Sequence, residues 1–502
     1  MPGAPWRSHC CNTCRKRKVK CDLQRPECAR CLRGGHHCQG YGRAAKFVHT
    51  FSESNDGSQV LETEKTPPNI PSYAPSPRDS VPTISSINVN AQIRSQLFSI
   101  FIDSYIPSSS PSQISFRCQR SSKLIGSFPS LTDTPKSQLL DRAIAALASV
   151  FVGKRFNDIN MLNNGVRVYN QAIRTFAQLI SRRELPVKEV LCANLIFQLY
   201  EIINCTSGFS GWMAHMEGAN AVLARHHQNL AGDDISKMLL RHLKLANIFH
   251  AIGKSKSALA SCPMWQMITP IEENNDLTDE IINILMHCTV LIELVGNANS
   301  DPDIQKLKRL CWKLERQTAS WYQRLKSISR EPLYTTMPDN TEVNLDRKSK
   351  HTFPDRYHFI ALEVAEAHSL YWAAQLIIYS LSSGLEIKRK SFTQHETTLT
   401  ESSSFNTKIG SDIHLKNAEF YADQICRGVA YLIQPEMHIL GGENLLFPVS
   451  MAAQFFHQNG HHDKYQWCQE VFVELESVGL GLSHVLQGTP WSEYRSGEAN
   501  AL

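Results

Sequence analysis

The chain has 502 residues, of which 42% are apolar and 20% are charged. This length exceeds what one compact core usually organises, and the composition is that of a folded protein rather than a disordered one. No apolar run reaches the roughly eighteen residues that a membrane span needs, and the start lacks the apolar segment of a secretion signal. We therefore expect an intracellular protein with no membrane partner, whose fifteen cysteines stay reduced.

Charge is distributed unevenly along the chain. Residues 1–46 hold eleven Lys and Arg against only Asp22 and Glu27, whereas the net charge of the whole chain is +5. The rest of the chain is therefore net acidic. A basic N-terminal segment in an otherwise acidic chain indicates that this segment binds a polyanion.

Residues 1–43 are rich in Cys, Arg and Lys and poor in large apolar side chains. A segment this short cannot bury enough surface to fold unaided, so we expect a metal-stapled module with two short helices. From residue 44 to 90 the composition shifts to Ser, Thr, Pro and Asn, which predicts a disordered, flexible linker.

From about residue 91 the apolar residues recur at helical spacing. A helix is predicted after Thr134 and Pro135 with a stop at Gly153, and a second one after Pro186. No run of alternating strands is long enough for a sheet, so we predict a large all-α domain over 91–480 and a C-terminal tail over 481–502. Residues 384–411 are interpreted as a disordered insertion. Further helical stripes are predicted over 157–182, 210–227, 236–262, 278–296, 301–326, 355–383, 413–434 and 462–480.

Six of the seven N-terminal cysteines follow a strict spacing, in which a second trio repeats the first at an offset of 17 residues. A Cys-x2-Cys turn lets two thiolates hold one tetrahedral zinc, and a short helix returns a third thiolate to the same ion. Two zinc ions need more ligands than six sulfurs supply, unless two thiolates bridge both ions. Cys11 and Cys28, which open the two halves, are the symmetric choice, whereas Cys10 would break the repeat. The predicted metal ligands are Cys11, Cys14, Cys21, Cys28, Cys31 and Cys38.

This stretch resembles the fungal binuclear zinc-cluster transcription factors. The resembling residues read CNTCRKRKVKCDLQRPECARCLRGGHHCQGY, from Cys11 to Tyr41. The resemblance implies that Cys11 and Cys28 bridge two Zn²⁺ ions, that Cys14 and Cys21 complete one site, and that Cys31 and Cys38 complete the other. It also implies a nuclear, sequence-specific regulator of RNA polymerase II transcription that binds double-stranded DNA and is not an enzyme.

The two halves share their cysteines but not their charge. The first half is strongly basic, whereas the second offers only Arg30 and Arg33, so the first half is expected to enter the major groove. Lys and Arg can donate to the N7 and O6 acceptors of guanine. The resemblance places the base-contacting lysine at Lys18, beside Arg17, and implies CGG-type half-sites. The predicted DNA-binding residues are Arg15, Lys16, Arg17, Lys18 and Lys20, a run that also fits a nuclear import signal.

Residues 91–480 resemble the fungal-specific transcription factor domain, through Gln96–Phe101, the 139–148 helix and the region of Gly211, Trp212 and His215. We interpret Trp212 and His215 as core packing. The resemblance implies a regulatory role, with a coactivator or a corepressor as partner. The alternative function is a corepressor or adapter scaffold in which the zinc module is a minor tether. No heptad follows the cluster, so either the helical body forms a homodimer or a monomer reads one triplet.

Two further motifs could bind metal, but each also has a simpler structural interpretation. The acidic residues Asp276, Asp279 and Glu280 are similar to an acidic metal-binding motif of helical terpenoid synthases, but their spacing is shorter than in that motif. Acidic residues at the start of a helix explain this pattern more simply. His457, His461 and His462, like His226 and His227, have metal-binding chemistry but read as exposed histidines.

Overall fold

The computed structural model describes two compact units, Met1–Val81 and Pro82–Leu502, which are treated separately below. The expected linker over 44–90 lies outside the described residues, and so do Cys10, Pro26 and Tyr41. The described residues are 11–22, 24, 28–38, 91–107, 121–127, 138–181, 185–205, 208–230, 232–261, 265, 276–338, 352–396 and 401–487.

The N-terminal unit contains two short helices, α1 (Asn12–Lys16) and α2 (Ala29–Arg33). Its buried cluster consists of the six spaced cysteines, and Val19 packs against it. Within the described part of this unit the interior is thus made of sulfur rather than of large apolar side chains, so a metal staple is the expected source of its stability.

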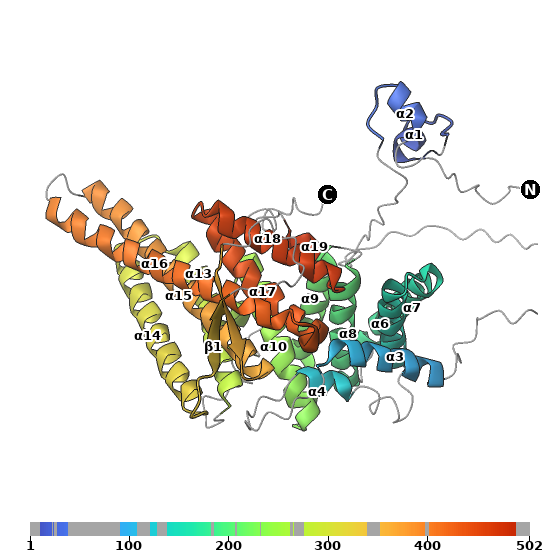
Figure 1. The fold of residues 1–502 in the computed structure, drawn as a ribbon, viewed down its shortest axis with the longest axis horizontal. Coiled ribbons are helices and arrows are strands. Elements are labelled where there is room, and N and C mark those ends of the chain that lie inside the picture. Colours follow the sequence, from blue (N-terminus) through green and yellow to red (C-terminus); the bar gives the residue numbers. More distant parts are fainter. Residues whose placement is uncertain are drawn as a thin grey trace, which may run out of the picture. The chain divides into compact units, whose positions relative to one another are not determined.

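The C-terminal unit is a large helical domain (Figure 1), and its described apolar residues form a continuous buried cluster. The expectation of a small cysteine module followed by a large helical domain is confirmed. Its helices are α3 (Ala91–Tyr105), α4 (Ser121–Gly126), α6 (Gln138–Arg155), α7 (Ile159–Ile180), α8 (Val187–Asn204), α9 (Phe209–His226), α10 (Asp234–Lys254), α11 (Ala258–Ser261), α13 (Leu277–Asn297), α14 (Asp301–Lys326), α15 (Leu362–Glu396), α16 (Glu401–Leu432), α17 (His438–Gln458), α18 (His462–Ser477) and α19 (Leu482–Leu486), with 3-10 turns at His227–Asn229 and Pro435–Met437.

Helix α8 lies at the centre of the core. It begins directly after Pro186, as predicted, and ends where Cys205 adopts a left-handed conformation with φ of 44°. Fifteen of its 18 residues are buried, so neighbours surround it on every side rather than along one stripe.

Helices α6 and α7 pack closely because glycines stand where they meet. A Cβ on Gly153 would come within 2.7 Å of the backbone of Leu162, and one on Gly165 would come within 2.5 Å of Val150. The prediction that Gly153 ends the helix is wrong, since α6 continues to Arg155. Gly153 is needed for close approach between helices and not for a turn.

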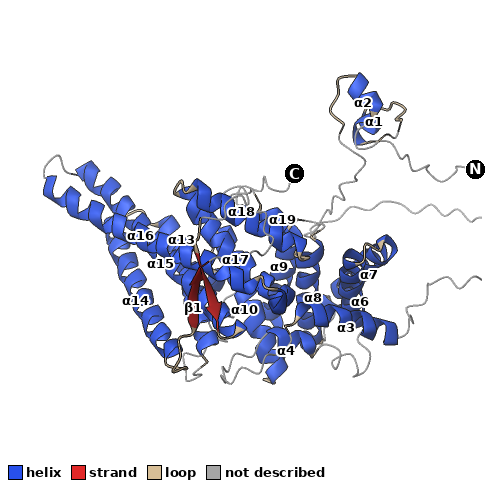
Figure 2. Cartoon of the chain, in the orientation of Figure 1, coloured by secondary structure: helices blue, strands red, loops and turns tan. Residues whose placement is uncertain are grey.

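The domain also contains a two-stranded antiparallel ribbon, β1 (Tyr334–Pro338) and β2 (Asp355–Phe359) (Figure 2). The prediction of one helix over 355–383 is therefore wrong at its start. In β2 the buried residues Tyr357 and Phe359 alternate with Arg356 and His358, which is the period of a strand. Tyr357 and Phe359 pack beside Trp372 of α15, with ring centroids 5.6 and 6.1 Å away.

The interpretation of 384–411 as a disordered insertion is also wrong for the described residues. Helix α15 runs to Glu396 and α16 starts at Glu401, and the two helices lie side by side (Figure 1). Polar composition misled the prediction here, because a segment rich in Ser and Thr can still form a helix within a helical domain.

Helix α17 was not predicted, since Gly441, Gly442 and Pro448 interrupt its pattern. Fourteen of its 21 residues are nevertheless buried. A Cβ on Gly441 would come within 2.2 Å of the Leu432 carbonyl oxygen, so this glycine allows α17 to pass close to the end of α16. Tertiary contact thus overrides the weak local propensity.

Helix α19 follows residue 480 and packs against α8 and α18, with Leu482 buried. In the described part of the chain, no helix combines the length and the apolar character needed to cross a bilayer.

Candidate metal centre and nucleic-acid interface

The six cysteines of the N-terminal unit form two overlapping groups of four. In each group the sulfur atoms all lie within 4.8 Å of one another. One group contains Cys11, Cys14, Cys21 and Cys28, and the other contains Cys11, Cys28, Cys31 and Cys38. Two four-sulfur sites built from six sulfurs must share two of them, and the shared pair here is Cys11 and Cys28.

The sulfur separations fit a metal of the expected size. Zn–S bonds of about 2.3 Å in a tetrahedron give an S–S edge of about 3.8 Å. The Sγ atoms of Cys11 and Cys28 are 3.6 Å apart, and those of Cys14 and Cys28 are also 3.6 Å apart. The Sγ atoms of Cys11 and Cys31 are 3.8 Å apart. The donor set therefore suits zinc in chemistry and in spacing.

The backbone repeats the symmetry of the cysteine spacing. The amide of Cys14 donates to the Cys11 sulfur and the amide of Cys31 donates to the Cys28 sulfur, both at 3.3 Å. The amides of Cys11 and Cys28 donate to the sulfurs of Cys21 and Cys38, both at 3.5 Å. N–H groups aimed at sulfur stabilise thiolates over thiols.

Without a bound cation the clustered thiols resist ionisation. Desolvation raises the pKa of Cys11 to about 12, and it also raises the pKa values of Cys14 and Cys28. A metal ion that binds here must displace protons, so its affinity falls as the pH falls.

Asp22 joins the two halves, a role that the sequence reasoning missed. Its carboxylate accepts hydrogen bonds from the amides of Ala29 at 3.2 Å and Arg30 at 2.7 Å, and so caps the start of α2. Thr13 of the first half donates to the carbonyl of His37 in the second, at 3.0 Å. The Cys21-Asp22 pair and the helix that starts seven residues later carried the signal for this cap.

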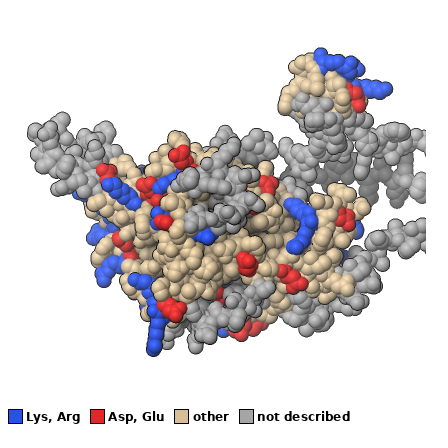
Figure 3. All heavy atoms as spheres, in the orientation of Figure 1, with Lys and Arg blue, Asp and Glu red and all other residues tan. Residues whose placement is uncertain are grey.

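The predicted DNA-binding residues lie on the surface of the first half. Lys16, Arg17, Lys18 and Lys20 are all exposed, while the Arg15 side chain lies outside the described residues. Lys and Arg side chains gather on part of the module surface in Figure 3. In the second half Arg30 and Arg33 are exposed as well, so the charge there is sparser rather than absent.

The ends of α1 and α2 differ at one informative position. Lys18 has a left-handed backbone with φ of 53°, and its repeat equivalent 17 residues later is Gly35, with φ of 64°. The amides that follow close the same turn, Val19 onto the Cys14 carbonyl and His36 onto that of Cys31, both at 3.0 Å. Glycine is the usual residue for this helix end, so Lys18 adopts a conformation that disfavours side chains.

The acidic motif of the helical domain is a structural feature. Asp276 caps α13 by accepting from the Thr278 amide at 2.9 Å, as the helix-start interpretation predicts. Arg241 binds Asp279 through two hydrogen bonds of 2.6 Å and also reaches Asp276 at 2.7 Å. Glu280 pairs with Arg324. These carboxylates are already paired with arginine.

Among the described residues, the predicted histidine groups do not form a metal-binding cluster. Among the described residues, the groups of His, Cys, Asp and Glu close enough to hold a metal are the two cysteine groups. His461 lies 3.6 Å from Glu419, and His227 contacts the carbonyl of Leu223 at 3.1 Å. His457 and His462 are exposed, which agrees with the plain interpretation.

His215 is part of a buried polar network. Its ring contacts the Tyr169 hydroxyl at 2.6 Å, and Tyr169 donates to Glu201 at 2.7 Å. Burial lowers the pKa of His215 to about 4, so the ring is neutral at pH 7. Trp212 is 5% exposed, in agreement with its interpretation as core.

Two family descriptions match the chain. The fungal Zn(2)-Cys(6) binuclear cluster domain matches residues 9–46, and the fungal specific transcription factor domain matches residues 96–409. Over 44 residues the chain is 41% identical to an uncharacterized transcriptional regulatory protein of Schizosaccharomyces pombe, a match that covers 9% of this chain and 8% of that protein. No solved structure matches. The cysteine module and the helical domain thus agree with the comparisons, and the chain belongs to the fungal zinc-cluster transcription regulators that carry a fungal-specific transcription factor domain.

Proposed function

We propose that this transcription regulator is a nuclear, zinc-dependent DNA-binding protein that acts on RNA polymerase II promoters and reads CGG-type triplets in the major groove. The observation that carries the proposal is a symmetric sulfur frame on which the dense basic run belongs to one half only. In this proposal the frame holds the module rigid and the basic half contacts DNA.

The metal part of the proposal assigns two Zn²⁺ ions to the six cysteines. Cys11 and Cys28 would bridge, since they belong to both four-sulfur groups. Cys14 and Cys21 complete one site, while Cys31 and Cys38 complete the other. Zinc serves here as a structural cross-link for a module with no apolar core of its own.

The DNA part of the proposal separates base contacts from phosphate contacts. Lys18 stands at the end of α1, fixed by the turn that closes on Cys14, and is assigned to guanine with Arg17 beside it. Arg15, Lys16 and Lys20 are assigned to phosphates, which position the module without reading sequence.

Fluorescence anisotropy with the full-length, zinc-loaded protein tests the proposal. A duplex with CGG triplets should bind more tightly than a scrambled duplex, and chelation of zinc should abolish the difference. Affinity for both duplexes should fall with salt, as phosphate contacts require. Equal, zinc-independent binding to both duplexes would refute the proposal and favour the adapter alternative.

The same proposal includes regulation through the helical domain, by a homodimer or by a coactivator or corepressor. Site selection from a random DNA library with the full chain distinguishes the two modes of binding. Two triplets at a fixed spacing would support a homodimer, and a single triplet would support a monomer.

A further inference from the structure

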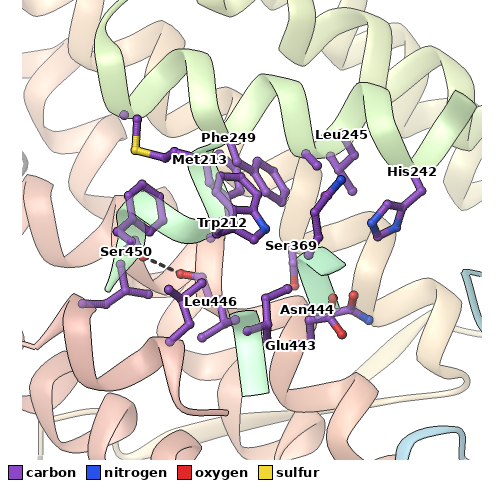
Figure 4. Close-up of a pocket in the computed structure, with 18 of the residues that line it drawn as sticks. Trp212, Met213, His242, Leu245, Phe249, Ser369, Glu443, Asn444, Leu446 and Ser450 are labelled. Atoms are coloured by element: carbon purple, nitrogen blue, oxygen red, sulfur yellow. Dashed lines mark hydrogen bonds between the residues drawn. The ribbon is translucent and has the colours of Figure 1, made fainter. Parts of the chain in front are cut away.

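The helical domain encloses a cavity of about 140 Å³ where helices α8, α9, α10, α15, α17 and α19 converge (Figure 4). None of the residues that line it belongs to the zinc module. A pocket of this kind, mostly apolar with a few polar groups, is typical of small-molecule sites. The DNA-reading proposal does not use this cavity, so the two can fail independently.

One side of the cavity is aromatic. Trp212 of α9 and Phe249 of α10 line it, and Phe249 stacks on Phe447 of α17 with ring centroids 3.8 Å apart. In Figure 4 Trp212 and Phe249 lie on the other side of the drawn group from Glu443 and Asn444. A dry cavity of about 150 Å³ is known to accept benzene, so the size suits one ring.

The other side of the cavity is acidic. Glu443 of α17 and Glu366 of α15 both line it, and the Tyr105 hydroxyl donates to Glu443. Burial, together with the negative charge of Glu366, raises the pKa of Glu443 to about 7. A cation placed between the ring wall and Glu443 would favour the ionised carboxylate.

Two other titratable side chains line the cavity, Lys254 and His242. Among the described residues that line the cavity, Lys254 is the one with a basic Lys or Arg side chain, and its ammonium group pairs with Glu217. His242 lines the cavity too, and desolvation lowers its pKa to about 4, so this ring is neutral at pH 7. The acidic groups that line the cavity are therefore the carboxyl groups of Glu366 and Glu443.

Gln198 adds a buried amide to the lining of the cavity. Gln198 of α8 is 1% exposed and lines the cavity. Its amide nitrogen donates to Asn194 at 2.8 Å, but its carbonyl oxygen has no hydrogen-bond partner in the described structure.

We propose that this cavity binds a small organic cation, in which an ammonium group on one apolar ring donates to Glu443 while the ring packs against Trp212 and Phe249. An ammonium offers donors and no acceptors, which matches the acceptors that line the cavity. Glu443 lies beyond residues 96–409, so this carboxyl group falls outside the segment that the family description covers, whereas Glu366 lies within it. The bound cation would join α9 and α10 to α17 within the regulatory domain.

Phenethylamine is the test ligand, with 2-phenylethanol as its neutral isostere and phenylacetate as its anionic counterpart. Isothermal titration of the full-length, zinc-loaded protein should give a Kd of about 1 mM or lower for phenethylamine, which is ordinary for a fragment of this size. The amine should bind at least about tenfold more tightly than the alcohol, because its hydrogen bond to the carboxylate is charged. Phenylacetate should not bind measurably.

Two variants locate the site. Glu443→Gln keeps an acceptor for Tyr105 and should abolish the preference for the amine while retaining weak binding of the alcohol. Glu366→Gln should reduce the same preference and serves if the first variant does not fold. The matched control is Glu436→Gln, an exposed position just before α17, which should leave all three affinities unchanged. Equal binding of amine and alcohol, an amine preference that survives both lining variants, or no binding at about 10 mM would each overturn the proposal.

Discussion

Each of the two units of this protein is stabilised in a different way. In the described part of the N-terminal module six cysteines are buried and Val19 packs against them, whereas the helical domain buries a continuous apolar cluster from Phe98 to Leu482. The first depends on a cation that the chain must bind, and the second depends on surface removed from water. Different substitutions should therefore disable the zinc module and the helical domain.

The largest expected effect is the loss of a bridging sulfur. Cys28→Ser should leave the module unfolded and abolish binding to a CGG duplex, since structural zinc supplies roughly 10–16 kcal/mol of folding free energy in comparable small modules. The melting temperature of the helical domain should not change. Zinc content by mass spectrometry and circular dichroism would check both statements. The control Cys205→Ser, at the end of α8, should keep both zinc ions, and a Cys28→Ser protein that retained full DNA affinity would refute the bridging role.

A substitution in the core of the helical domain should have the opposite effect, so that this domain is destabilised while DNA binding is unchanged. Phe197 is fully buried between Tyr169, Phe176 and His215, with ring centroids 5.4 to 5.8 Å away. Phe197→Ala should destabilise the helical domain by roughly 3–5 kcal/mol and leave DNA binding intact. Thermal unfolding and anisotropy measure the two effects. Phe156→Ala, at a side chain 63% exposed, is the control and should change stability by less than about 0.5 kcal/mol. A parallel loss of DNA affinity would show that the two units are coupled.

Substitutions of Lys18 should separate the effects on the stability of the zinc module from the effects on DNA binding. Lys18→Ala should weaken binding to CGG sites by roughly 1–3 kcal/mol relative to random duplex. Lys18→Gly should lose the same specificity but gain roughly 0.5–1 kcal/mol of stability, because it relieves the left-handed backbone at a small entropic cost. Gly35→Lys, the mirror change in the second half, should lose stability without losing affinity, because a side chain is strained at a φ of 64°. Among the described residues no atom lies within 4 Å of a Cβ placed there, so crowding does not add to this loss.

Anisotropy on both duplexes and the rate of zinc release to a chelator measure these three variants. Equal losses of affinity on CGG and random DNA would contradict a base contact for Lys18. Lys16→Ala, in contrast, should weaken both duplexes alike and flatten the salt dependence.

The smallest expected effect concerns the cap that joins the halves. Asp22→Ala should destabilise the zinc-loaded module by about 1 kcal/mol, whereas Asp22→Asn should retain most of the cap. Zinc release to a competing chelator should be faster for the alanine variant than for the asparagine variant. Identical release rates for both would show that the bonds to Ala29 and Arg30 do not stabilise the module.

Much of the metal centre followed from spacing. Two thiolates three residues apart reach one ion in any backbone that turns between them, and the 17-residue repeat made Cys11 and Cys28 the symmetric pair. The helix starts after Pro186 and Asp276 were also visible, because a proline just before the first turn and a capping acid act locally. The left-handed Lys18 was not visible, since no residue preference predicts a strained backbone there.

Only the tertiary structure decided the features that depend on distant neighbours. Gly153 looks like a helix end in the sequence and is a contact with α7, and Pro448 looks like a break and lies inside α17. The cavity joins residues from Gln198 to Leu486, which local patterns cannot bring together. Sequence alone fixes what is governed by short-range bonding, such as metal-ligand spacing and helix caps. Packing between segments hundreds of residues apart is decided by the fit of surfaces that meet only in the folded chain.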